Sequence, residues 1–227
     1  MTSLVAWIAV DSRAPASIYL ASDSRISWGT RQTWDYGRKL FASRNYAEIL
    51  GYFGDVLFPS QVLGQLVYLI DSDLLFSAED LPANKWLKIV SVVRQSFEAY
   101  PDENARPFTI VYCGRENSGM AAVFHMYALS WEPNEGWVDK REIDLPKESG
   151  IIGVFGSGEE VVNRWYSYWS RTKQKRTSRS VFSAFCDALI GGEDKYSGGA
   201  PQLVGIYRQG VAETFGIIYN NRRYLLG

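Results

Sequence analysis

The sequence predicts an α+β domain of two stacked, mainly antiparallel β-sheets with helices on their outer faces. Apolar residues make up 46 % of the 227 residues and aromatic residues 15 %, which is enough material for a substantial core. Strand-like segments form three groups, and two pairs of helix-like segments separate them. Because strands and helices do not alternate singly, a doubly wound parallel sheet is disfavoured. We expect residues 1–227 to form a single domain.

The chain is expected to open with a hairpin. The apolar segments Ser3–Val10 and Ser17–Ala21 flank the turn-forming run Asp-Ser-Arg-Ala-Pro-Ala. Further short segments have strand character because they are apolar or β-branched and end at Gly, Pro, Asn or charged residues. These segments are Lys39–Ala42, Glu48–Phe53, Pro107–Cys113, Met120–Leu129, Gly136–Ile143, Ile151–Phe155, Gln202–Tyr207 and Ala212–Tyr219.

Four other segments repeat apolar residues at helical spacing, which places those side chains on one face. The first pair lies between Val62 and Ile70 and between Trp86 and Phe97. The second pair lies between Val161 and Trp169 and between Phe182 and Leu189. Each predicted helix therefore has one apolar face to pack against a sheet.

Composition limits the kinds of binding partner and the cellular compartment that we expect for this protein. A formal net charge of −1 gives no global field that would recruit nucleic acid or an anionic membrane. Cys113 and Cys186 are too far apart for a disulfide framework or a zinc signature. The apolar run Leu4–Val10 is too short for a signal peptide or a membrane span. We therefore expect a soluble, cytoplasmic protein that binds neither nucleic acid nor a membrane.

The single histidine, His125, excludes a multi-histidine metal centre and confines imidazole-based catalysis to one residue. It lies within the strand-like run Val-Phe-His-Met-Tyr, where a structural role is the commoner case. A Cys113–His125 dyad is the alternative that these residues leave open. The glycine-rich turn Gly153–Gly158 would suit a phosphate at a helix start, although no Lys-Ser/Thr follows it. We expect no metal ion and no cofactor.

A hydrolase that lacks imidazole and metal needs another base. The α-amino group of the chain is one solution, because its unperturbed pKa is about 7.7–8.0. This amine must belong to the residue that carries the nucleophile. The second residue is Thr2, whose small size favours removal of the initiator Met1. Removal would leave a hydroxyl and a free amine on the same residue.

Five short segments follow Thr2 in an order that is typical of one family. They are Asp23–Gly29 (Asp-Ser-Arg-Ile-Ser-Trp-Gly), Lys39 within Arg-Lys-Leu-Phe, Ile49–Asp55 (Ile-Leu-Gly-Tyr-Phe-Gly-Asp), Gly156–Gly158 (Gly-Ser-Gly) and Asp194–Gly199 (Asp-Lys-Tyr-Ser-Gly-Gly). Together they resemble the proteasome β-subunit family, including its bacterial relatives. Lys39 follows Asp23 at the family's spacing. The resemblance is weakest between Asp71 and Gly150.

The resemblance implies the four-layer αββα sandwich of N-terminal-nucleophile hydrolases and a threonine-type peptidase. Thr2 would be both nucleophile and base. Lys39 would lie beside its hydroxyl as a cation, which Asp23 would keep charged and oriented. Three further residues would form the hydrogen-bond network around the amine: Ser157, Asp194 and Ser197.

The resemblance also indicates where the substrate would bind. Gly54 is the best candidate for the backbone N–H donor of the oxyanion hole, and Gly51 is the alternative. The substrate would add as a strand between Ser27 and Gly54, with a side chain in a pocket. Phe53 would border that pocket, which suggests an apolar preference.

Departures from the family pattern concern the first hairpin and the assembly. The stretch from Thr2 to Asp23 is several residues longer than usual, with the extra residues near Asp11–Ser17, and Ser27 stands where a threonine is usual. The resemblance implies a homo-oligomeric ring of unknown order. An unfolding ATPase would have to be a separate chain, because no Gly-x-x-x-x-Gly-Lys-Ser/Thr motif occurs.

The implied substrate is a peptide or an unfolded protein, but two other functions stay open. The same N-terminal chemistry serves many small amides, so a small-molecule amidohydrolase is one alternative. A non-catalytic ring subunit or scaffold is the other. Loss of Met1 is the condition for both catalytic functions, because Thr2 otherwise has no free amine.

Overall fold

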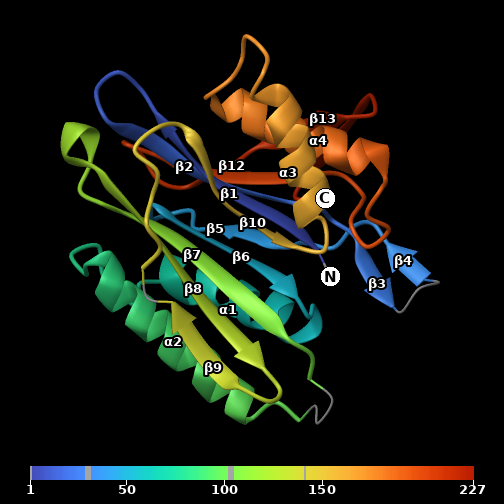
Figure 1. Cartoon of the computed structure of the whole chain (residues 1–227). Coiled ribbons are helices and arrows are strands. Elements are labelled where there is room, and N and C mark those ends of the chain that lie inside the picture. Colours follow the sequence, from blue (N-terminus) through green and yellow to red (C-terminus); the bar gives the residue numbers. More distant parts are fainter. Residues whose placement is uncertain (1, 29–31, 102–104, 141) are drawn as a thin grey trace.

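A computed structural model describes residues 2–28, 32–101, 105–140 and 142–227 of the chain. Two antiparallel sheets are stacked face to face, and a pair of helices covers the outer face of each sheet (Figure 1). The predicted α+β class and the four-layer αββα sandwich are therefore confirmed. The order of elements is also the predicted one, with helix pairs between groups of strands.

The first sheet contains the start of the chain. Its strand order is β10-β1-β2-β11-β12, and every neighbouring pair is antiparallel. The strands are β1 (Ser3–Val10), β2 (Pro15–Ser22), β10 (Gly150–Gly156), β11 (Gln202–Tyr207) and β12 (Glu213–Thr214). In β1, Leu4 is opposite Ser22 of β2, and Ser3 is opposite Gly156 of β10. Thr2, which precedes β1, therefore lies between the ends of two neighbouring strands.

The second sheet has the strand order β5-β6-β7-β8-β9. Its strands are β5 (Leu40–Ala42), β6 (Glu48–Gly54), β7 (Phe108–Glu116), β8 (Val123–Glu132) and β9 (Gly136–Lys140). Lys39 directly precedes β5, and Gly54 ends β6 with a φ of +95°. Both residues thus lie at strand ends, where the backbone leaves the regular ladder.

Two small hairpins accompany the sheets: β3 (Ile26–Trp28) with β4 (Gln32–Trp34), and β13 (Gly216–Tyr219) with β14 (Arg222–Leu225). The β3–β4 hairpin projects from one end of the sandwich (Figure 1). Because Ile26 is opposite Trp34, the side chains of Ile26, Trp28 and Trp34 share one face of it. Gly29 lies outside the described residues.

Four helices flank the sheets. They are α1 (Leu57–Asp71), α2 (Pro82–Glu98), α3 (Glu159–Trp169) and α4 (Ser178–Gly191). All four segments with helical spacing fall inside them, so these predictions are confirmed. Pro59 and Pro82 lie in first turns, where proline is tolerated because those N–H groups have no partner in the helix. Within the described residues, no helix has the length and apolar character needed to cross a membrane.

Apolar cores fill the space between the four layers. Alternate side chains of β1 contribute to two different cores. Leu4 and Ala6 point into the core between the sheets, whereas Val5 and Trp7 point toward α3 and α4. Thr2 has the same parity as Leu4, so its side chain is directed to the space between the two sheets.

Several strands differ from the prediction, and β3, β4 and β14 were not expected. The segment Ala212–Tyr219 is not one strand but divides into β12 and β13 at Phe215. The chain leaves the first sheet there to form the β13–β14 hairpin. β8 is displaced along the chain, from Met120–Leu129 to Val123–Glu132, because a short 3₁₀ turn precedes it, and β9 is shorter than expected because it ends at Lys140.

Candidate active site

The start of β1 is held by the glycine turn between β10 and α3. Thr2 is buried, and its carbonyl oxygen accepts the N–H of Ser157 at 3.0 Å. Gly156 has a φ of +88°, and a Cβ atom there would lie 1.7 Å from the Thr2 carbonyl oxygen, so only glycine fits. The Ser157 N–H therefore serves Thr2 and not a phosphate. Met1, whose removal the predicted mechanism requires, lies outside the described residues.

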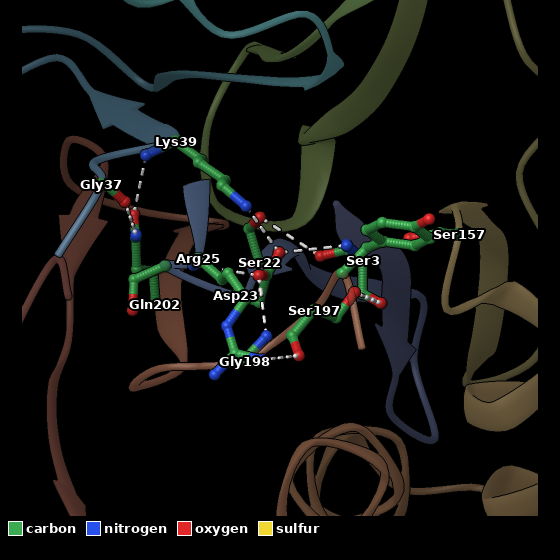
Figure 2. A network of polar contacts seen from close by, with 12 residues as sticks. Ser3, Ser22, Asp23, Arg25, Gly37, Lys39, Ser157, Ser197, Gly198 and Gln202 are labelled. Atoms are coloured by element: carbon green, nitrogen blue, oxygen red, sulfur yellow. Dashed lines mark hydrogen bonds and ion pairs between the residues drawn. The ribbon is translucent and has the colours of Figure 1, made fainter. Parts of the chain in front are cut away.

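Beside Ser3, at the start of β1, Asp23 and Lys39 form a buried ion pair (Figure 2). The Lys39 Nζ is 2.8 Å from Asp23 Oδ1, and both side chains are 0 % exposed. Oδ1 also accepts the Ser3 N–H, and Oδ2 accepts the N–H groups of Arg25 and Gly198, each at 3.0 Å. Burial lowers the pKa of the Lys39 amine, and the Asp23 carboxylate opposes this shift. Three backbone N–H groups thus fix the carboxylate that orients the lysine.

At the Ser3 side chain, Asp194 organises three hydroxyl groups. Its Oδ2 accepts the hydroxyls of Ser157 and Ser197, each at 2.7 Å, and Ser197 Oγ is 2.7 Å from Ser3 Oγ. A hydroxyl has one proton to donate. Ser197 gives its proton to Asp194, so Ser3 must be the donor to Ser197. Ser157 also gives its proton to Asp194, so toward any further partner its oxygen is only an acceptor.

Arg25 connects the β3–β4 hairpin with the Asp194 loop. Its guanidinium forms a two-fold ion pair with Asp35, with N–O distances of 2.7 and 2.9 Å. It also donates to the carbonyl oxygens of Lys195 and Ser197 at 3.3 Å. A Cβ atom at Gly198 would lie 2.5 Å from the Arg25 Cζ, so this glycine is needed for the close contact. The pair Arg25–Asp35 had no assigned role in the sequence-based prediction.

A cavity of about 740 Å³ opens beside the two polar groups. The β3–β4 hairpin forms one wall and the end of β6 with the start of α1 forms the other, while Gly156 and Ser157 connect it to the start of β1. Of the residues expected to bind substrate, Ser27, Phe53 and Gly54 line this cavity. Phe53 stacks on Phe155 with ring centroids 5.3 Å apart.

The structure does not bring Gly51 to the cavity. Gly51 lies within β6, opposite Leu40 on one side and Val111 on the other, so its N–H belongs to the sheet ladder. A Cβ atom there would lie 2.8 Å from Leu40 Cδ2, which makes Gly51 a packing residue. At Gly54 a Cβ atom would lie 2.4 Å from the Pro107 carbonyl oxygen. Position 54 therefore requires glycine because the Pro107 backbone lies so close, whether or not a substrate also approaches it.

The alternative Cys113–His125 dyad is wrong, because the two side chains are on opposite faces of the second sheet. Cys113 is opposite Met126 and belongs to the core between the sheets. His125 is one position along β8 from Met126, and its ring stacks on Tyr127, which faces the α1–α2 side. Burial also raises the pKa of the Cys113 thiol far above its ordinary value. The His125 Nδ1 is 3.0 Å from Glu142 Oε1, as expected of a structural histidine.

Elsewhere in the described part of the chain, no three His, Cys, Asp or Glu residues gather as they would around a metal ion. Sequence-based reasoning missed three polar residues of the site. They are Ser3, Asp35 and Gln202, whose side chains hydrogen-bond to Ser197, Arg25 and the Lys39 backbone. A lone amide in the apolar run Gln-Leu-Val-Gly-Ile-Tyr was the one available signal.

Comparison with known proteins gives a structural match only. No family model matches the sequence, and no curated protein sequence matches it. Among solved structures, the fold matches eukaryotic HslV from Trypanosoma brucei, a proteasome β-like protein, with a TM-score of 0.52. The match covers 90 % of this chain and 99 % of that chain at 13 % sequence identity. The chain therefore has the fold of the proteasome β-like N-terminal-nucleophile hydrolases.

Proposed function

We propose that residues 1–227 act as one threonine-type peptidase domain, with Thr2 as the nucleophile after loss of Met1. One observation carries this proposal: a buried ion pair and a hydroxyl network both adjoin Ser3, the first residue of β1. The Asp23 carboxylate of the ion pair accepts the Ser3 N–H, and the hydroxyls oriented by Asp194 extend to the Ser3 hydroxyl. A buried charge is unfavourable without a partner, and so are the buried hydroxyls of Ser3 and Ser197, whereas Ser157 at the end of the network is exposed. Their coincidence at a chain start supports a chemical purpose.

The directions of the hydrogen bonds around Asp194 support the Thr2 amine as the base. Because Ser157 donates to Asp194, its oxygen presents lone pairs, which accept an N–H of the Thr2 amine. An amine held in this way through its N–H groups directs its own lone pair to the Thr2 hydroxyl, directly or through one water. The unperturbed pKa of an α-amino group, about 7.7–8.0, is suitable for a base near neutral pH.

The proposed reaction proceeds through an ester. The Thr2 hydroxyl attacks the peptide carbonyl carbon, and its proton passes to the Thr2 amine. Lys39 stabilises the developing negative charge on the Thr2 oxygen, and the backbone at Gly54 contributes to the oxyanion hole. The C–N bond breaks as the leaving nitrogen takes the proton from the amine. Water then attacks the ester, gives a proton to the amine, and returns Thr2 to its free form.

The cavity is large enough to hold side chains of a peptide. Its volume of about 740 Å³ is in the range of sites for drug-sized ligands, larger than a single side chain requires. We propose that a peptide or unfolded-protein segment pairs as a strand between Ser27 and Gly54 and places apolar side chains in the cavity. Turnover of a small amide without turnover of peptides would instead support the amidohydrolase. A non-catalytic ring subunit is the remaining alternative.

The hairpin tryptophans provide a test of substrate preference. Trp28 and Trp34 line the cavity and are 56 % and 48 % exposed, so a substrate side chain can stack on them. We expect Trp34→Ala to lower kcat/KM for peptides with aromatic side chains about tenfold, and to have a smaller effect on alanine-rich peptides. Tyr168→Ala, which removes an exposed aromatic ring on α3, is the matched control. An equal loss for both peptide classes would contradict this preference.

The fold also supports proposals about assembly and location. We propose that copies of the chain form a homo-oligomeric ring, as the resemblance to the proteasome β-subunit family implies, and that any unfolding ATPase is a separate protein. We further propose a cytoplasmic location, since Cys113 and Cys186 are both free thiols, as is usual in a reducing compartment.

Intact-mass measurement tests the proposed function directly. The mature protein should lack the mass of Met1 and should gain one adduct when it reacts with an electrophilic peptide. Fragmentation should place that adduct on Thr2, because only this residue then combines a hydroxyl with a free amine. Retention of Met1 on the mature protein would rule out the mechanism and leave the non-catalytic alternative.

A further inference from the structure

The backbone that carries Lys39 lies outside any β-ladder. Residues 35–39 have no regular secondary structure, and β5 begins only at Leu40. Buried backbone N–H and C=O groups need partners, so the position of this segment depends on what binds them. The Gly37 N–H donates to the Ser24 carbonyl oxygen at 2.8 Å. The Asp35 and Arg38 carbonyl oxygens accept the hydroxyls of Ser24 and Tyr52. One further side chain binds the backbone groups nearest to Lys39.

That side chain is Gln202, in the first residue of β11. Its Oε1 accepts the N–H of Lys39 at 3.0 Å and the N–H of Leu40 at 3.3 Å, while its Nε2 donates to the Gly37 carbonyl oxygen at 2.6 Å. Figure 2 shows Gln202 beside Gly37 and the Lys39 backbone, with the lysine side chain extending from there toward Asp23. Gln202 is 0 % exposed. The Gln202 side-chain amide therefore makes the backbone hydrogen bonds that a neighbouring strand would otherwise make.

We propose that Gln202 is a positioning residue for catalysis, which acts through Lys39. The inference rests on the proposed function of Lys39 as the cation beside the Thr2 hydroxyl. Gln202 belongs to the first sheet, where it is opposite Ser22, and Lys39 leads into the second sheet. The amide thus fixes the lysine backbone on the sheet that also carries Thr2 and Asp23. The distance from the Lys39 ammonium to the reacting oxygen depends on this link.

The expected effect is on turnover and not on binding. Gln202 is not among the residues that line the cavity, so its loss should leave KM within about twofold of the parent value. A displacement of about 1 Å at a catalytic group lowers the rate about 100-fold. We therefore expect Gln202→Leu, which removes all three hydrogen bonds at similar size, to lower kcat about 10- to 100-fold. Gln202→Asn keeps the amide but is one methylene too short, so it should behave similarly.

Two measurements test this inference on the full-length protein. Amide hydrogen exchange, followed on a peptide that spans Gly37–Leu40, reports on the backbone hydrogen bonds without reference to activity. Steady-state kinetics on a peptide substrate report kcat and KM. Ser17→Ala is the matched control, because it removes a buried hydroxyl at the opposite end of the β2–β11 pair, opposite Tyr207. It should change neither the exchange at Gly37–Leu40 nor kcat.

Faster exchange at Gly37–Leu40 together with a lower kcat and an unchanged KM would support the inference. Unchanged exchange in both Gln202 variants would overturn the hydrogen-bond link, and faster exchange with unchanged kcat would overturn the positioning role. A loss of kcat that Ser17→Ala reproduces would also overturn it. A parent protein without turnover would contradict the proposed hydrolase instead, and the positioning role would fail with it.

Discussion

Replacement of Thr2 by alanine is expected to abolish peptide hydrolysis and covalent labelling by an electrophilic peptide. The substitution removes the attacking oxygen but keeps a small second residue, so Met1 should still be removed. The Thr2 contact with the glycine turn uses a backbone carbonyl, which alanine retains. We therefore expect the variant to fold and assemble as the parent does. Activity, intact mass and size-exclusion chromatography are the measurements.

Thr2→Ser is the matched control, because serine keeps both the hydroxyl and the amine on one residue. It should retain labelling at residue 2 and part of the turnover. Labelling of the Thr2→Ala protein at any position, with turnover preserved, would show that another nucleophile is used. Loss of assembly in Thr2→Ala alone would mean that the threonine side chain serves the structure and not the reaction.

The layers of the fold could be predicted from the sequence because each depends on local periodicity. The apolar residues between Val161 and Trp169, for example, lie on one face of α3, and that face packs on the first sheet. The path of the chain at Phe215 could not be predicted in this way. The residues on both sides of Phe215 have strand character, but they pair with different partners, β11 and β14. Pairing is a non-local choice that local pattern does not encode.

The same distinction between local pattern and non-local contact applies to the residues of the candidate site. Asp23, Lys39 and Asp194 are in short motifs that the resemblance makes visible, and the structure places each of them around the start of β1. Gln202 contacts Lys39 across 163 positions of sequence, and no motif marks it. Gly51 was the alternative to Gly54 for the oxyanion hole. It lies within the segment Ile49–Asp55, which carries the resemblance, but its small size is needed for packing against Leu40 in the core.

The buried ion pair explains why the fold can hold a lysine between two sheets. A buried ammonium without a partner is strongly unfavourable, and Asp23 compensates it because three backbone N–H donors hold the carboxylate in place. Two of these donors come from segments that contact the proposed substrate and amine regions, Arg25 and Gly198. The ion pair is thus connected to both halves of the site.

Lys39→Met is expected to lower kcat about 1,000-fold, because it removes the cation nearest to the developing negative charge. It should also lower the free energy of unfolding by about 3–5 kcal/mol, because the Asp23 carboxylate is left buried without its counter-charge. The matched control is Lys88→Met, which breaks an ion pair with Asp80 at the surface. Surface pairs contribute little, so this control should keep both activity and stability. Chemical denaturation and steady-state kinetics are the measurements.

The pH dependence of turnover separates the charge of Lys39 from its packing. Burial lowers the pKa of Lys39, so its cation is lost at a lower pH than that of an exposed lysine. Turnover should rise with pH as the Thr2 amine loses its proton and should fall again as Lys39 loses its own, which gives a bell-shaped profile. Lys39→Arg stays protonated throughout, so the alkaline decrease should disappear, whatever its maximal rate. An unchanged alkaline decrease in Lys39→Arg would assign it to another group and would contradict a role for the lysine cation.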